Sequence, residues 1–167
     1  MDRDECTSLS EPELRKFNFK TFDELTKIGR DALQIYFDRI FPPMDLAIAL
    51  TNNEHSLQHG HHKLDADQCT LLFPADRSIP SSAAFDVTIM YKLLRNYGPN
   101  ISPPSKGWGK KPDIGQKLPT DDVERIRLYR NEVEHKTRTT SLMEKDDFEL
   151  KWKDLSQVTD MLRFYVD

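Results

Sequence analysis

Apolar residues recur along the chain at three- and four-residue intervals, which is the period of an amphipathic α-helix. The longest such stretches are 22–40, 81–97, 120–135 and 145–165, and shorter ones follow Asp45 and Asp65. Capping signals precede several of them, at Thr21 with Glu24, at Thr120, and at Ser141 with Glu144. No stretch of five or six residues alternates cleanly between apolar and polar positions. The pattern predicts an all-α bundle of about four long helices with short accessory helices.

The last helical stretch carries a single apolar seam at three- and four-residue spacing. Its members are Phe148, Trp152, Leu155, Val158, Leu162 and Tyr165. We expect the seam from Phe148 to Leu162 to be buried against the apolar faces of 22–40 and 83–97. A core position for Trp152 would make its replacement by alanine cost roughly 3–5 kcal/mol of stability.

A long segment without helical period separates two of the predicted helices. Residues 98–119 hold five of the ten prolines and four of the six glycines. A structureless segment of this length inside a small domain is usually functional or disordered. Because Trp108 is a large indole between two glycines, we expect it to be at least partly buried and to anchor this Pro/Gly-rich loop over one edge of the bundle.

Length and composition fit one folded domain. The chain has 167 residues, of which 37% are apolar and 31% are charged. Residues 1–20 precede the first helical period, so we expect them to form a loosely attached N-terminal segment. The chain ends within the last apolar pattern, at "RFYVD". Residues 1–167 are therefore interpreted as a single domain excised from a longer multidomain protein.

The charge argues against a general nucleic-acid binder. The net charge is −4, whereas such binding is driven by cations that neutralise phosphates. Residues 106–138 are an exception, with nine basic and six acidic side chains. Cys6 and Cys69 have neither disulfide nor metal-site spacing, which indicates a reduced, cytoplasmic compartment. No apolar run approaches the roughly 20 residues that cross a bilayer, so no membrane contact is expected.

The stretch "LYRNEVEHK", residues 128–136, is the strongest candidate for chemistry. Arg130 offers a planar cation that matches a phosphate, and the histidine side chain, supplied here by His135, is the type best suited to both taking and giving a proton. RNA cleavage through its own 2′-hydroxyl needs a base, an acid and a cation of this kind. On a regular helix, however, Arg130 and His135 point about 140° apart. Either the helix is deformed near Glu132–Glu134 or a second copy of the motif completes the site.

Other polar clusters carry weaker signals. One comprises His59, His61, His62, Asp65, Asp67 and Cys69. These are potential metal ligands, but their spacing matches no zinc signature, so a solvated turn is favoured and no metal or cofactor is expected. Arg95 and Asn96 are interpreted as a helix C-terminal cap. The alternating charges of 124–130 are typical of a solvated helix face.

Several separated motifs occur together in order along the chain. They are "LLFP", "FDVTIMYKLLRNY", a Pro-rich loop with "GWG", "DDVERIRLYRNEVEH" and "FELKWKDLSQVTDML". This series, from about Phe22 to Leu162, resembles the HEPN domain of the DAZ-interacting zinc-finger ubiquitin-ligase type. HEPN domains are α-helical bundles that commonly pair. In active members, two motifs with an arginine, a polar residue and a histidine meet across a dimer and cleave RNA without metal.

The resemblance assigns roles to individual residues. It implies that His135 carries the proton, Arg130 clamps the phosphate and Asn131 orients the groups, on single-stranded RNA and in a symmetric homodimer. The cations near the motif are expected to bind RNA; they are Arg127, Lys136 and Arg138. The alternative is a non-catalytic HEPN module for dimerisation or protein interaction in a larger signalling or innate-immune protein.

Overall fold

The computed structural model describes residues 9–164, except for the side chains of Thr159 and 161–164. Its helices are α1 (Glu11–Ile40), α2 (Pro43–His59), α3 (Ala66–Leu72), the short 3-10 helix η1 (Ser82–Ala84), α4 (Val87–Tyr97), α5 (Pro119–Thr139) and α6 (Lys145–Phe164). Within residues 9–164 there is no β-strand. The predicted all-α fold is therefore confirmed. None of the helices described is both long and apolar enough to cross a membrane.

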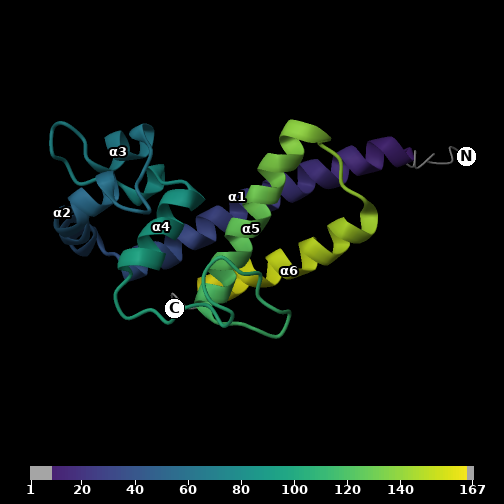
Figure 1. Ribbon diagram of the computed structural model, residues 1–167. Helices are drawn as coiled ribbons and strands as arrows, with labels where there is room; N and C mark the ends of the chain where they lie inside the picture. The colour runs from purple at the N-terminus through teal and green to yellow at the C-terminus, as the bar shows by residue number, and fades with distance from the viewer. Residues whose placement is uncertain (1–8, 165–167) are drawn as a thin grey trace, which may run out of the picture.

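α1 is the longest helix and organises the others. It runs almost the whole length of the molecule, with α5 and α6 along one half and α2, α3 and α4 gathered around the other (Figure 1). α1 contacts α4, α5 and α6 directly. A Cβ atom at Gly29 would lie 3.4 Å from Leu155 and 3.6 Å from Ile126. Gly29 therefore lies where α5 and α6 both meet α1, and a Cβ atom at this position would make ordinary van der Waals contact.

The first helix begins eleven residues earlier than the apolar period, which starts at Phe22, predicts. α1 starts at Glu11, and the Ser10 backbone N–H donates to the Glu13 carboxylate at 2.9 Å. Asn18 is buried and donates to the Met143 carbonyl. The prediction of a loosely attached segment over 1–20 is therefore wrong for residues 11–20, while residues 1–8 lie outside the described part of the chain. The apolar period missed this segment because a polar contact, through Asn18, holds it to the loop before α6.

The seam on α6 is only partly buried. Leu155 and Val158 are buried and Phe148 is half-buried, but Trp152 is 41% exposed. Trp152 lies about 60° from Leu155 and about 120° from Val158 around the helix, at the edge of the apolar face. The prediction of a core indole at position 152 is therefore wrong. The side chains of Leu162 and Tyr165 lie outside the described residues.

Two other helices differ from the predicted boundaries. α2 continues through the polar stretch to His59, far beyond the short helix expected after Asp45. α4 begins at Val87 rather than near 81, and the Asp86 carboxylate accepts the Ile89 N–H at 2.7 Å as its cap. The extension of α2 covers polar residues, which carry no apolar period to define a boundary. Before α4, residues 82–84 form the separate helix η1, and the Asp86 cap sets the start of α4.

The Pro/Gly-rich loop between α4 and α5 is anchored by its tryptophan, as predicted. Trp108 is half-buried, and its ring meets the Tyr91 ring edge-on with 5.5 Å between centroids. Gly107 and Gly109 both have φ of 83°, in the left-handed region that favours glycine. These two glycines let the loop turn sharply on either side of the indole and insert it against α4.

Candidate nucleic-acid interface

The candidate motif lies on α5, and this helix is regular throughout. α5 is continuous from Pro119 to Thr139, so each residue adds about 100° of rotation. The helix is not deformed near Glu132–Glu134. On a single chain, Arg130 and His135 therefore point about 140° apart. One copy of the motif does not bring the two side chains together.

Four of the predicted site residues share the solvent-facing side of α5. We call Arg127, Asn131, His135 and Arg138 the α5 stripe. Successive steps of four, four and three residues place them on one face over about 16 Å. Asn131, His135 and Arg138 are exposed, and Arg127 is half-buried. Within the described residues, the His135 side chain makes no hydrogen bond or ion pair, so its imidazole is accessible.

Arg130 lies beside the stripe and is already engaged. Its guanidinium pairs with the Glu134 carboxylate at 2.7 Å. It also donates to the Thr88 hydroxyl of α4 at 3.2 Å and to the Asn131 side-chain oxygen at 3.3 Å. The structure therefore brings Arg130 and Asn131 together and holds the arginine against α4. A phosphate bound at Arg130 would compete with Glu134.

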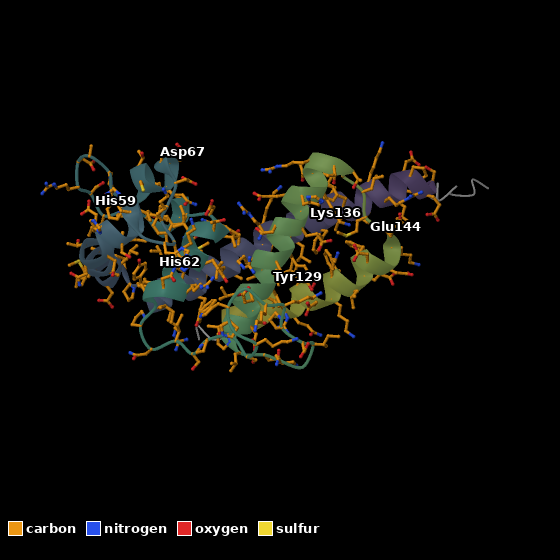
Figure 2. The ribbon with its side chains drawn as sticks, viewed as in Figure 1. His59, His62, Asp67, Tyr129, Lys136 and Glu144 are labelled. Atoms are coloured by element: carbon orange, nitrogen blue, oxygen red, sulfur yellow. The ribbon has the colours of Figure 1, made fainter. Side chains whose placement is uncertain are left out.

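Lys136 points away from the stripe, toward α6. It lies 3.3 Å from Asp147 and 3.6 Å from Glu132, and Lys151 joins the same two carboxylates. Figure 2 shows Lys136 at the same end of the molecule as Glu144 and far from His62. Lys136 is therefore paired within the fold, whereas Arg138 has no side-chain partner among the described residues. Of the three predicted RNA-binding cations, Arg127 and Arg138 share the stripe and Lys136 lies on another side of α5.

Buried acidic side chains at the start of α5 hold the Pro/Gly-rich loop. The Asp121 carboxylate accepts hydrogen bonds from the backbone and hydroxyl of Ser105, both at 2.7 Å, and from the Leu118 N–H at 2.9 Å. The Glu124 carboxylate accepts from the Gly109 N–H at 2.6 Å. Asp121 and Glu124 are completely buried. The expectation that 124–130 is a solvated face is therefore wrong at its first turn, because the loop covers it.

Glu124 also fixes the first residue of the stripe. Its second carboxylate oxygen accepts from Arg127 at 3.0 Å, and the Tyr91 hydroxyl donates to the first at 2.6 Å. The Arg127 guanidinium lies over the Tyr91 ring, 4.8 Å from its centroid. Burial, followed by the hydrogen bond to Glu124, raises the pKa of Tyr91 to about 12. Tyr91 therefore remains a neutral donor, and Arg127 is held in one orientation.

Arg125 forms the centre of a second buried network. It lies 2.9 Å from Asp122 and 3.4 Å from Asp154 of α6. It also donates to the carbonyls of Asp113 and Gln116 in the loop, each at 2.7 Å. Arg125 and Asp122 are each only 3% exposed. This guanidinium therefore joins α5, α6 and the loop at one point.

Asp122 gives the fold a pH dependence near neutrality. Burial raises its pKa from 3.8 to about 7, although Arg125 lies close by and opposes the shift. One carboxylate oxygen of Asp122 is buried without a hydrogen-bond partner among the described residues. A raised folded-state pKa means that stability is fully present below pH 3.8 and is lost as the pH rises through about 7.

We expect wild-type protein to lose about 2 kcal/mol of unfolding free energy between pH 5 and pH 8 through this group, and Asp122→Asn to lack that loss. Urea unfolding at both pH values measures the difference. Asp45→Asn is the matched control, since Asp45 lies in the first turn of α2 but is exposed. A wild-type profile identical to that of Asp122→Asn would contradict the assignment.

A surface pocket of about 220 Å³ lies between α4 and α5, and we call it the α4–α5 pocket. Its lining includes Thr88, Lys92, Arg95, Arg127, Asn131 and His62. Sequence reasoning assigned Arg95 to a helix cap and passed over Thr88 and Lys92. The available signal was their spacing, which puts Thr88, Lys92 and Arg95 on one polar face of an otherwise apolar helix.

The histidine-rich segment forms ring pairs rather than a ligand cage. His55 and His59 lie with 5.1 Å between ring centroids on α2, and His61 stacks on His62 at the same distance. Figure 2 shows His59 and His62 apart from one another and from Asp67. In the part of the chain that the structure describes, no three His, Cys, Asp or Glu side chains are placed to hold a metal ion.

Comparison with known proteins identifies the family. The human and mouse proteins named E3 ubiquitin-protein ligase DZIP3 are each 26% identical to this chain over 153 residues, which is 86% of this chain but only 12% of each relative. No solved structure matches the chain. The family model described as DZIP3/hRUL138-like HEPN matches residues 43–164, from the start of α2 to the end of α6. Because this match spans most of the chain and agrees with its helical fold, the protein belongs to the DZIP3/hRUL138-like HEPN family.

Proposed function

We propose that two copies of this domain pair along α5 and cleave single-stranded RNA without a metal ion. The supporting observation is the regular helix between Arg130 and His135, which keeps the two side chains about 140° apart on one chain. His135 is exposed and has no side-chain partner among the described residues. A second α5 facing the first brings the missing group to each histidine, and two-fold symmetry makes the contact self-complementary.

The chemistry follows from the side chains of the paired motifs. His135 of one copy takes the proton of the RNA 2′-hydroxyl, and that oxygen attacks the adjacent phosphorus. The bond from phosphorus to the 5′-oxygen breaks, and the leaving oxygen takes a proton from the second histidine. Arg130 stabilises the charge on the equatorial phosphate oxygens, and Asn131 holds Arg130 through their hydrogen bond. The products end in a 2′,3′-cyclic phosphate and a 5′-hydroxyl.

Purified domain incubated with single-stranded RNA and EDTA tests this proposal. We expect cleavage products with 2′,3′-cyclic phosphate ends, and light scattering should show a dimer at the concentrations where cleavage occurs. Products ending in a 3′-hydroxyl would indicate a different reaction. A protein that remains monomeric while cleaving at full rate would contradict the composite site.

A non-catalytic interaction module is the second candidate, and one contact favours it. Glu134 pairs with Arg130 at 2.7 Å and leaves the arginine partly neutralised. Under this alternative, the α5 stripe serves pairing or partner binding, and neither wild-type protein nor Glu134→Gln cleaves RNA. If Glu134 only restrains an active site, Glu134→Gln should cleave faster than wild type, because it frees Arg130 for phosphate.

A further inference from the structure

The α4–α5 pocket is cationic, and none of the described residues that line it is acidic. Lys92, Arg95 and Arg127 all line it, together with the Asn131 amide and the Thr88 hydroxyl. The Arg127 charge is balanced by the buried Glu124 beneath it. In contrast, Lys92 and Arg95 form no ion pair within the described residues. The pocket therefore carries two uncompensated positive charges on a chain whose net charge is −4.

The groups in the pocket are suited to a phosphate. Arg95 is exposed, and its side chain makes no hydrogen bond or ion pair within residues 9–164, so its planar fork is available to oxygen acceptors. The Lys92 ammonium makes only long contacts, 3.4 Å to the Lys63 carbonyl and 3.3 Å to Gln68. The volume of about 220 Å³ lies below the roughly 300–1,000 Å³ of small-molecule pockets. A pocket of this size suits one phosphate and its sugar better than a larger ligand.

The pocket offers no open tyrosine face on which a base could stack. Tyr91 lines it, but one face of the Tyr91 ring is covered by Arg127 and Trp108 meets it edge-on. Stacking of successive bases on aromatic faces is the usual base contact of proteins that bind single strands. With that face covered, the cations of the pocket remain available to a phosphate, and contacts to phosphate are independent of sequence.

The pocket is continuous with the candidate motif. Asn131 belongs both to its lining and to the α5 stripe, and His135 follows one turn further along the same face, about 6 Å along the axis. Thr88, also in the lining, accepts the hydrogen bond from Arg130. A strand whose phosphate occupies the pocket can therefore extend over the stripe to His135.

We propose that the α4–α5 pocket is a second phosphate subsite, which binds a non-reacting phosphate of single-stranded RNA and positions the chain for the paired motifs. This inference rests on the proposed function for its substrate. Binding energy from a phosphate remote from the reacting bond serves to orient the substrate at the histidine. A phosphorylated peptide is the competing occupant, and its affinity is compared with that of RNA.

Binding of a fluorescein-labelled, unstructured RNA is measured by anisotropy in EDTA, with all variants made in a His135→Ala background that keeps the RNA intact. Arg95→Ala should weaken binding about 5- to 10-fold and reduce the slope of log affinity against log salt by about 0.7. Arg39→Ala is the matched control: Arg39 is an exposed arginine in the last turn of α1, as Arg95 is in the last turn of α4. Its affinity should stay within about 2-fold of the parent.

The outcomes separate this inference from the proposed catalysis. Equal losses in Arg95→Ala and Arg39→Ala, or no RNA binding at all, would overturn the subsite. A phosphoserine peptide that binds more tightly than RNA, with the same dependence on Arg95, would also overturn the RNA assignment. RNA binding that depends on Arg95, in a protein that never cleaves, supports the subsite and refutes the nuclease. Cleavage that is equally fast in otherwise wild-type Arg95→Ala and Arg39→Ala refutes only the subsite.

Discussion

Replacing Arg125 with methionine should lower the free energy of unfolding by about 3–5 kcal/mol. The guanidinium is buried between the carboxylates of Asp122 and Asp154 and two loop carbonyls. Methionine fills a similar space but leaves buried acceptors without a donor, and an uncompensated buried group costs far more than the net gain from an intact pair. Urea or thermal unfolding monitored by circular dichroism measures the loss.

A second arginine of α5, Arg138, provides the control for the buried position of Arg125. Arg138→Met removes the same charge from the same helix at an exposed site without a side-chain partner among residues 9–164, and it should change stability by less than about 0.5 kcal/mol. Asp122→Leu combined with Arg125→Met should be less harmful than the sum of the single changes, because each single change strands the other partner. Strict additivity would mean that the two side chains do not interact.

Replacing His135 with alanine should reduce RNA cleavage by at least about 100-fold, which is the lower end of the contribution of a positioned acid or base. The dimer and the melting temperature should stay nearly unchanged, because His135 is exposed and its side chain contacts no described residue through a hydrogen bond or ion pair. Initial cleavage rates at saturating RNA, compared with those of Arg138→Ala on the same stripe, measure the effect. Arg138→Ala should affect RNA affinity more than the maximal rate.

Mixing experiments then test whether both copies are needed. Wild-type and His135→Ala chains are combined in equal amounts at fixed total concentration and allowed to exchange. If each reaction uses a histidine from both copies, only about a quarter of the dimers are active. If each chain acts alone, about half of the activity remains. A linear decline with the fraction of mutant chain would therefore exclude a mechanism that uses the histidines of both copies in one reaction.

The helical period in the sequence predicted the fold class, because burial of one face imposes a three- and four-residue spacing wherever the core is apolar. Polar contacts leave no such spacing. The first turns of α1 are held through Asn18 and the loop before α6, and this explains the misplaced start at Phe22. Trp152 obeys the apolar spacing but lies at the edge of its face. Periodicity alone does not distinguish a residue at the edge of an apolar helix face from one at its centre.

The buried charges of α5 were hidden for a different reason. Glu124 and Arg125 look like ordinary surface residues because their partners come from the distant loop, which has no regular period of its own. In contrast, the 140° separation of Arg130 and His135 was predictable, because it depends only on the helix being regular. That the polar groups of α4 face α5 could be seen only in the tertiary structure. The spacing of residues within one helix does not show which other helix its polar face will meet.

The buried charged residues of α5 hold the Pro/Gly-rich loop largely through hydrogen bonds to its main chain. Asp121 and Glu124 bind the backbone N–H groups of Ser105 and Gly109, and Arg125 binds backbone carbonyls. Trp108 and the buried Pro112 also pack against the fold, whereas exposed side chains such as Ile114, at 83% exposure, contribute little to holding the loop. Exposed side chains such as those of Lys110 and Ile114 can therefore be varied while the path of the loop is kept. Insertions that displace Asp113 or Gln116 would break the hydrogen bonds to Arg125. These exposed positions are suited to affinity libraries made by side-chain substitution on a helical scaffold.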